Sequence, residues 1–284
     1  MPLREFETCR QRIERARAHS EAFAKIWNDL LEDDAYSASL KIDDDGTGFI
    51  TFGTGHDALP VELGLELGEF LYHLRAALDA CVYAAAVVES GQNPPPDEDR
   101  LEFPLCSDPG GEDKFNKSAW KYRPLTNQRR VIIESVQPYK TPELRDDLYI
   151  LNMNRTLGIL NDWARIDRHR KLHVVGSWAS RAEPALRLPP GIELEWMMVT
   201  YDGFLENDGL IATFKLDGYT IGAKVEANPN VFVDVTVNES PEPCADNDTL
   251  SNRTKFMLIY VSEVVRAIEQ SLIDEREAGV GIPD

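Results

Sequence analysis

The spacing of apolar residues changes along this chain, and the change limits the folds that it can adopt. Up to about residue 171, most apolar residues recur every three or four positions, which predicts amphipathic helices. After residue 173, prolines and glycines interrupt the sequence, and apolar residues alternate with polar ones as in half-buried strands. We therefore expect an α+β fold, in which a helical bundle packs with a mostly antiparallel β-sheet.

The expected elements follow from this pattern. Helices are expected over 3–32, 60–89, 126–136, 142–171 and 250–275, and strands over 36–42, 49–52, 192–196, 210–216, 219–225 and 231–237. The first two strands form a hairpin, which has too few strands to stand alone, so we expect it to join the sheet of residues 192–237. We expect one unit over 1–284, with mainly helical parts at 1–32 and 57–175, sheet parts at 36–54 and 176–238, and a C-terminal helix at 249–275.

Composition excludes some functional classes. The net charge of −19 argues against a protein that covers nucleic acid with its whole surface, although it allows a local basic site. The four cysteines form neither a C-x-x-C pair nor a metal-ligand spacing, so we expect buried thiols, no metal and no cofactor. The N-terminus lacks an apolar signal core, and no apolar run has the length of a membrane span. We therefore expect a cytoplasmic protein that does not bind membranes.

The most unusual segment is residues 161–173, N-D-W-A-R-I-D-R-H-R-K-L-H, which holds four cations, two carboxylates and two of the five histidines. His169 and His173 are four residues apart and share a helix face, as zinc ligands do. The two cations between them oppose a dication, so we do not expect a metal there.

A structural interpretation and a catalytic one both remain. In the structural interpretation, Arg75 and Asp79 on one helix meet Asp167 and Arg170 on another in an ion-pair network, because half-buried charges need partners. In the catalytic interpretation, the end of the helix cleaves RNA without a metal. Histidine moves protons at the ribose hydroxyl or the leaving oxygen, and an arginine neutralises the phosphate.

Residues 114–130 form a basic stretch with six Lys or Arg residues, no acidic residue and three interleaved aromatic residues. In the functional interpretation, phosphates and bases of RNA are bound by Lys117, Trp120, Lys121 and Arg123. In the alternative, which we favour, the stretch is a solvated loop. Its aromatic residues then pack inward, and its cations offset neighbouring acids.

Four short motifs together resemble a large group of bacterial proteins of unassigned activity. Those proteins read roughly LRsALD, FP, QPY and iDKHR in this order. This chain has H-L-R-A-A-L-D at 73–79, F-P at 103–104, Q-P-Y at 137–139 and I-D-R-H-R at 166–170. Arg168 stands where the group has lysine. The resemblance covers roughly residues 60–175 and implies no activity by itself.

The spacing R-x-x-x-x-H at the end of a bundle helix is similar to that of the HEPN superfamily of helical domains. Many members are dimeric RNases of toxin and defence systems, and others are non-catalytic. The resemblance implies that Arg168 and His173, with His169 beside them, form the catalytic group of a metal-independent endoribonuclease, and that a symmetric homodimer pairs two such groups. The alternative is a non-catalytic interaction protein in which these charges hold helices together.

Overall fold

The structure is a computed structural model that describes residues 2–32, 36–54, 59–107, 110–143, 148–169, 174–200, 209–228, 230–237 and 249–279. The α+β class is confirmed. The chain divides into two compact units, whereas the sequence predicted one. The helical unit comprises Met1–Phe23, Gly64–Leu172 and Arg253–Asp284, and the sheet unit comprises Ala24–Leu63 and His173–Asn252.

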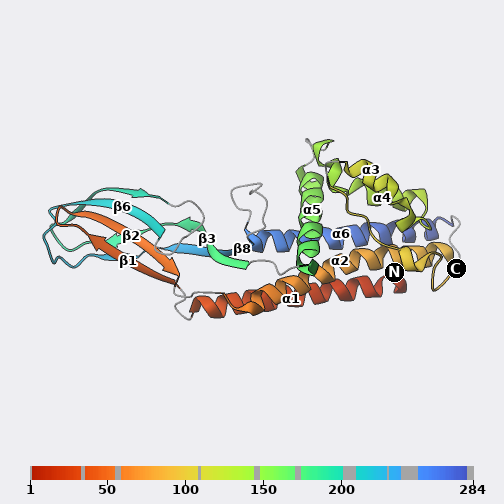
Figure 1. Cartoon of the computed structure of the whole chain (residues 1–284), viewed down its shortest axis with the longest axis horizontal. Helices are drawn as coiled ribbons and strands as arrows, with labels where there is room; N and C mark the ends of the chain where they lie inside the picture. The colour runs from red at the N-terminus through yellow and green to blue at the C-terminus, as the bar shows by residue number, and fades with distance from the viewer. Residues whose placement is uncertain are drawn as a thin grey trace. The chain divides into compact units, whose positions relative to one another are not determined.

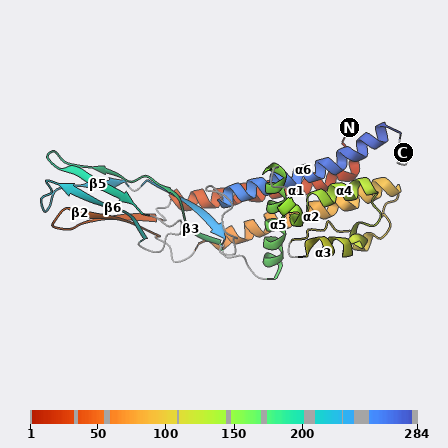
Figure 2. The ribbon, with the colours of Figure 1, turned by 90° about the horizontal axis from the view of Figure 1, so that it is seen from above.

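Long helices frame the helical unit. They are α1 (Glu7–Glu32), preceded by the 3-10 turn η1 (Arg4–Phe6), α2 (Val61–Ser90) and α6 (Leu250–Glu277). Within the unit they run lengthwise beside one another in both views (Figures 1 and 2). The apolar stripe of α2 is buried along its length, as in Leu67, Leu71 and Leu74. Arg10 of α1 donates to Glu269 of α6 at 2.9 Å, which adds a polar tie beside the core.

Shorter elements complete the helical unit. They are η2 (Glu98–Arg100), α3 (Gly111–Lys117), η3 (Ala119–Tyr122), α4 (Asn127–Ser135), η4 (Pro138–Glu143) and α5 (Leu148–His169). α5 crosses the long helices (Figure 1), and its Trp163 is buried beneath the guanidinium of Arg253 on α6. The predicted helix over 142–171 is therefore too long at its start, because residues 138–143 form a 3-10 helix instead.

α2 is long and apolar enough to cross a membrane by length and composition alone, so the expectation that no run has this length was wrong. Of the 18-residue stretch of α2 that meets this test, 67% is buried inside the protein. The core helix of a folded protein meets the same test, and α2 occupies that place in the helical unit.

The sheet unit contains a four-stranded antiparallel sheet with the order β1-β2-β6-β5. Its strands are β1 (Tyr36–Ile42), β2 (Thr47–Thr54), β6 (Gly209–Asp217) and β5 (Glu193–Val199). The hairpin of β1 and β2 joins the later strands through the β2–β6 ladder, which pairs Ile50 with Ala212. The prediction that the hairpin joins the later sheet is confirmed.

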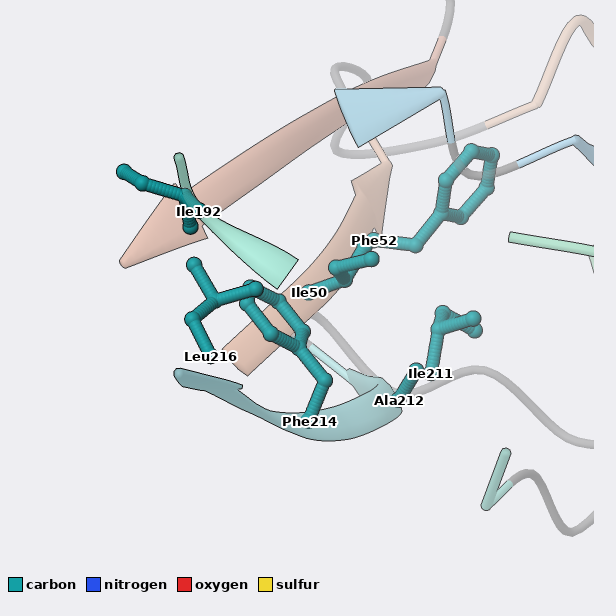
Figure 3. Close-up of a cluster of buried hydrophobic side chains, with 7 residues drawn as sticks. All are labelled: Ile50, Phe52, Ile192, Ile211, Ala212, Phe214 and Leu216. Carbon is teal, nitrogen blue, oxygen red and sulfur yellow. The ribbon is translucent and has the colours of Figure 1, made fainter. Parts of the chain in front are cut away.

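The core of the sheet unit lies on one face of this sheet. Side chains from β2 and β6 and the nearby Ile192 gather there: Ile50, Phe52, Ile192, Ile211, Ala212, Phe214 and Leu216 (Figure 3). Gly48 pairs with Phe214 across the ladder, and a Cβ at Gly48 would stand 2.1 Å from the Phe214 ring. Glycine at this position therefore lets the ring lie over the neighbouring strand.

Among the described residues, two further ladders accompany this sheet. β3 (Val174–Ala182) pairs with β8 (Val231–Val237), and β4 (Ala185–Arg187) pairs with β7 (Glu226–Asn228). The prediction of a strand over 219–225 was wrong. Gly218 and Gly222 have φ of +72° and +90°, so the chain turns there and strand pairing resumes only at Glu226.

Candidate functional site

Arg75 on α2 is the centre of a polar clamp in the helical unit. Its guanidinium donates to Asp79 at 2.7 Å, to Glu102 at 3.1 Å and to the carbonyl of Phe103 at 2.6 Å. The backbone N–H of Phe103 in turn donates to Asp79 at 2.9 Å. Burial raises the pKa of Asp79, and the charge of Arg75 and this N–H act against the rise. The clamp fixes the segment after η2 onto α2.

Gln137 fixes the other end of the same segment. Its side chain is fully buried, accepts from the N–H of Cys106 at 3.0 Å and donates to the carbonyl of Pro104 at 2.8 Å. Asn154 of α5 donates to the Gln137 carbonyl at 3.0 Å. Three of the four motifs, at 73–79, 103–104 and 137–139, therefore meet in one hydrogen-bonded assembly, which gives them a structural role.

At least three of the six cations in the basic stretch of residues 114–130 pair with acids of the helical unit. Lys117 pairs with Asp113, and Lys121 pairs with Glu102 at 2.6 Å. Arg129 is fully buried between Glu89 and Glu275. These acids lie outside the stretch, so residues 114–130 look like an isolated basic region when only the sequence is considered.

The aromatic residues of this stretch also turn mostly inward. Phe115 and Tyr122 are buried and stack on each other, and burial raises the pKa of Tyr122 to about 12. Trp120 remains half-exposed, with Lys121 over its ring, and Arg123 is exposed. The predicted loop is therefore wrong, because the stretch forms α3, η3 and the start of α4. The predicted offset of cations by acids holds for Lys117 and Lys121, whereas Trp120 and Arg123 stay accessible.

The fourth motif faces a cavity of about 650 Å³ between α2 and α5 in the helical unit. From α5, the cavity is lined by Ala164, Asp167, Arg168 and His169. From α2, it is lined by Gly64, Leu65, Gly68, Glu69, Tyr72, Arg75, Ala76 and Asp79. The volume falls in the range of small-molecule sites. Described members of both the predicted network and the predicted catalytic group line this cavity.

The described part of α5 offers chemically available groups to this cavity. Arg168 and His169 are exposed, and the only hydrogen bond of Arg168 to a described residue runs from Nε to the Ala164 carbonyl at 3.3 Å. Among the described residues, no group accepts a hydrogen bond from its terminal nitrogens, which an anion in the cavity could therefore engage. The other two predicted residues of this segment, Arg170 and His173, lie outside the described residues.

Asp167 lies directly against α2. A Cβ at Gly68 would stand 2.7 Å from its Oδ2, so the missing side chain at Gly68 makes room for this carboxylate. α2 and α5 are therefore neighbours, as predicted. Arg75 forms ion pairs with Asp79 and Glu102, and Arg170, the fourth residue of the predicted network, lies outside the described residues, so the network as a whole stays a prediction.

A second cavity of about 600 Å³ adjoins the first in the helical unit. Tyr72, Ala76 and Asp79 line both cavities, and Arg12 of α1 lines the second. Tyr72 is 53% exposed, and the Arg12 guanidinium lies 5.9 Å from its ring centre. An exposed aromatic ring between two cavities is a surface on which a base can stack.

One cluster of potential metal ligands was not predicted. His19 of α1 and Glu69 and His73 of α2 bring one ligand atom each within 4.8 Å of one another. Because 54 positions separate the two histidines, no local spacing revealed the cluster. Burial, the adjacent His19 and the arginines at 12 and 15 lower the pKa of His73 against the opposing effect of Glu69.

The chain was compared with known protein families, with curated proteins and with solved structures. None of them matches it.

Proposed function

We propose that the cavity between α2 and α5 binds RNA and cleaves it without a metal ion, in the manner of HEPN-like endoribonucleases. The observation that carries the proposal is a difference between the four motifs in what their side chains contact. Three of them are committed to holding the chain segment after α2, whereas the fourth presents Arg168 and His169 to an open cavity. Groups left available in a cavity are the ones that can meet a substrate.

The proposed chemistry assigns a role to each group. A neutral histidine takes the proton of the ribose 2′-hydroxyl, whose oxygen attacks phosphorus. Arg168 neutralises the pentavalent phosphate, and a protonated histidine gives its proton to the leaving 5′-oxygen. The products are a 2′,3′-cyclic phosphate and a 5′-hydroxyl. His169 and His173 supply the two histidines, and a symmetric homodimer would place two such groups together.

The local charge predicts how strongly RNA binds. The lining contains the cations Arg75 and Arg168 and the carboxylates Glu69, Asp79 and Asp167, and Arg75 is already paired. Few phosphates are therefore neutralised, so the affinity should be modest and its dependence on salt shallow. Stacking of a base on Tyr72 supplies binding that does not depend on charge.

The test is incubation of EDTA-treated protein with mixed RNA, followed by analysis of the ends of the products. Arg168→Ala, His169→Ala and His173→Ala should each reduce cleavage by a factor of about 100 or more, because acid–base catalysis typically contributes this much. Arg165→Ala is the matched control. Arg165 is exposed one turn earlier on α5, pairs with Asp162 at 3.8 Å and does not line the cavity.

The second candidate function is a non-catalytic interaction protein. This function is favoured by the ion pairs that Lys117, Lys121 and Arg129 form within the chain. A cation that is already paired with a carboxylate is less available to the phosphates of RNA. Cleavage that persists in the His173→Ala protein, or a wild type that does not bind RNA at low salt, would reject the first function and retain the second.

A further inference from the structure

Two histidines from different helices lie against each other in the helical unit. The rings of His19 on α1 and His73 on α2 stack with centroids 5.4 Å apart and an interplanar angle of 16°. Glu69 precedes His73 by one helical turn, so its carboxylate lies on the same side of α2. The potential ligand atoms of these three residues lie within 4.8 Å of one another.

His73 has unused hydrogen-bonding capacity. The residue is only 9% exposed, and its Nδ1 is buried without a hydrogen-bond partner among the described residues. Its Nε2 is 4.0 Å from the nearest oxygen of Glu69, which is beyond hydrogen-bond distance. A buried polar group left without a partner is unfavourable, so the ring is ready to accept a ligand.

Glu66 forms a hydrogen bond with the ring of His19. Its Oε2 lies 2.7 Å from Nδ1 of His19, which fixes the proton on that nitrogen and leaves the lone pair of Nε2 available. This carboxylate–histidine arrangement recurs behind metal-binding histidines, where it orients the ring and increases its basicity. His19 therefore has the tautomer of a metal ligand that binds through Nε2 before any metal arrives.

We propose that His19, Glu69 and His73 bind one divalent transition-metal ion of the zinc class and that Glu66 orients His19. Two imidazole nitrogens and one carboxylate oxygen suit zinc, nickel, copper or iron better than magnesium or calcium, which prefer oxygen ligands. Ligands at about 2.0–2.1 Å in a tetrahedral site stand roughly 3.4 Å apart, so side-chain rotations that close the present spacing complete the site. A fourth position remains for water.

The neighbouring charges set the strength of the site. Arg12 and Arg15 of α1 act on His73 and oppose a dication, whereas Glu66 and Glu69 offset them. The metal joins α1 to α2, so it should raise the stability of the helical unit. Its affinity should be lower than that of structural zinc sites, which have four protein ligands.

The experiment uses the full chain, stripped with EDTA and then titrated with zinc chloride in competition with a chromophoric chelator. One equivalent should bind and raise the thermal midpoint. Cobalt chloride should give the visible absorption of a low-coordinate site. His19→Ala and Glu69→Gln, whose side chains are not fully buried, should abolish tight binding. Glu66→Gln should weaken binding by about 10-fold, because it removes only the orienting carboxylate.

Two matched controls separate this site from other zinc sites. Glu62→Gln, an exposed carboxylate in the first turn of α2, should bind zinc like the wild type. His169→Ala should also leave zinc binding unchanged. Zinc binding that survives His19→Ala and Glu69→Gln, or is lost in His169→Ala, would overturn the proposal. RNA cleavage in EDTA is measured separately, so either proposal can fail alone.

Discussion

Buried arginines form ion pairs that connect separate segments of the helical unit. Arg129 has a fully buried side chain, with Glu89 and Glu275 on α2 and α6 as its partners. Glu89 also accepts from the N–H and hydroxyl of Thr126, each at 2.7 Å. The Glu89 carboxylate therefore accepts the hydrogen bonds of Thr126 at the start of α4. The Thr126 side chain itself makes no capping hydrogen bond within the helix.

Arg129→Met should destabilise the helical unit by about 3–5 kcal/mol, because it leaves two carboxylates without their buried counter-charge. Methionine keeps much of the side-chain volume, so the loss reports mainly on charge. Urea unfolding followed by circular dichroism measures it. Arg123→Ala, an exposed arginine of the same basic stretch, should change stability by less than about 0.5 kcal/mol. Equal effects for the two variants would contradict this account.

Ionisation of the Tyr122 hydroxyl makes the stability of the folded protein depend on pH in the alkaline range. Its folded-state pKa is raised to about 12 by burial, whereas an exposed tyrosine titrates near 10. Between these values the folded state holds the proton more tightly, so this contribution to stability is complete below about pH 10 and is lost as pH rises through 12. The urea midpoint should fall more steeply over this range in the wild type than in Tyr122→Phe. Parallel curves would exclude the effect.

The residues of the site were predictable only where their partners are close in sequence. The four-residue spacing of Arg75 and Asp79 placed them on one helix face, and in the structure they form an ion pair there. Glu102 and Phe103 follow a loop with no periodic pattern, so their place beside Arg75 could not be foreseen. His19 and His73 are each ordinary on their own helix, and only the docking of α1 on α2 brings them together.

At the scale of elements, the helices were easier to predict than the strands. Continuous apolar stripes identified α1, α2 and α6 because burial of a helix face requires that spacing. The alternating residues 219–225 imitate a strand, but the left-handed backbone at Gly218 and Gly222 produces turns. Glycines indicate turns, and here they predicted the backbone better than the alternation of apolar and polar residues did.

The contact between α5 and α2 at Gly68 can be tested by substitution. Gly68→Ala gains about 1 kcal/mol of helix propensity but places a Cβ 2.7 Å from Asp167 Oδ2. The contact is with the far end of a side chain, which can rotate away more easily than backbone, so the loss of stability should be small. The displaced carboxylate should alter the cavity and lower RNA binding or cleavage.

The double variant Gly68→Ala/Asp167→Ala tests whether this effect passes through the carboxylate. In the Asp167→Ala background, Gly68→Ala should have no further effect on function, because the clashing group is absent. Additive losses from the two substitutions would show that Gly68 acts through another contact. Thermal midpoints of all three variants would separate altered function from altered folding.

At the scale of the whole molecule, the chain passes repeatedly between two units that each have a core. The helical unit buries the apolar stripe of α2, and the sheet unit buries the cluster around Phe214. The candidate cavity, the arginine clamp and the proposed metal site all belong to the helical unit. A unit with its own core is expected to unfold cooperatively by itself.

We therefore predict two thermal transitions in calorimetry, each moved by a different substitution. Gly48→Ala places a Cβ 2.1 Å from the Phe214 ring, and overpacking of this kind costs about 1–3 kcal/mol, so it should lower the transition of the sheet unit. Arg129→Met should lower the other transition, and zinc should raise that same transition in the wild type. If both substitutions move one common transition equally, the two units fold as a single cooperative body, and the functional residues depend on the sheet for their stability.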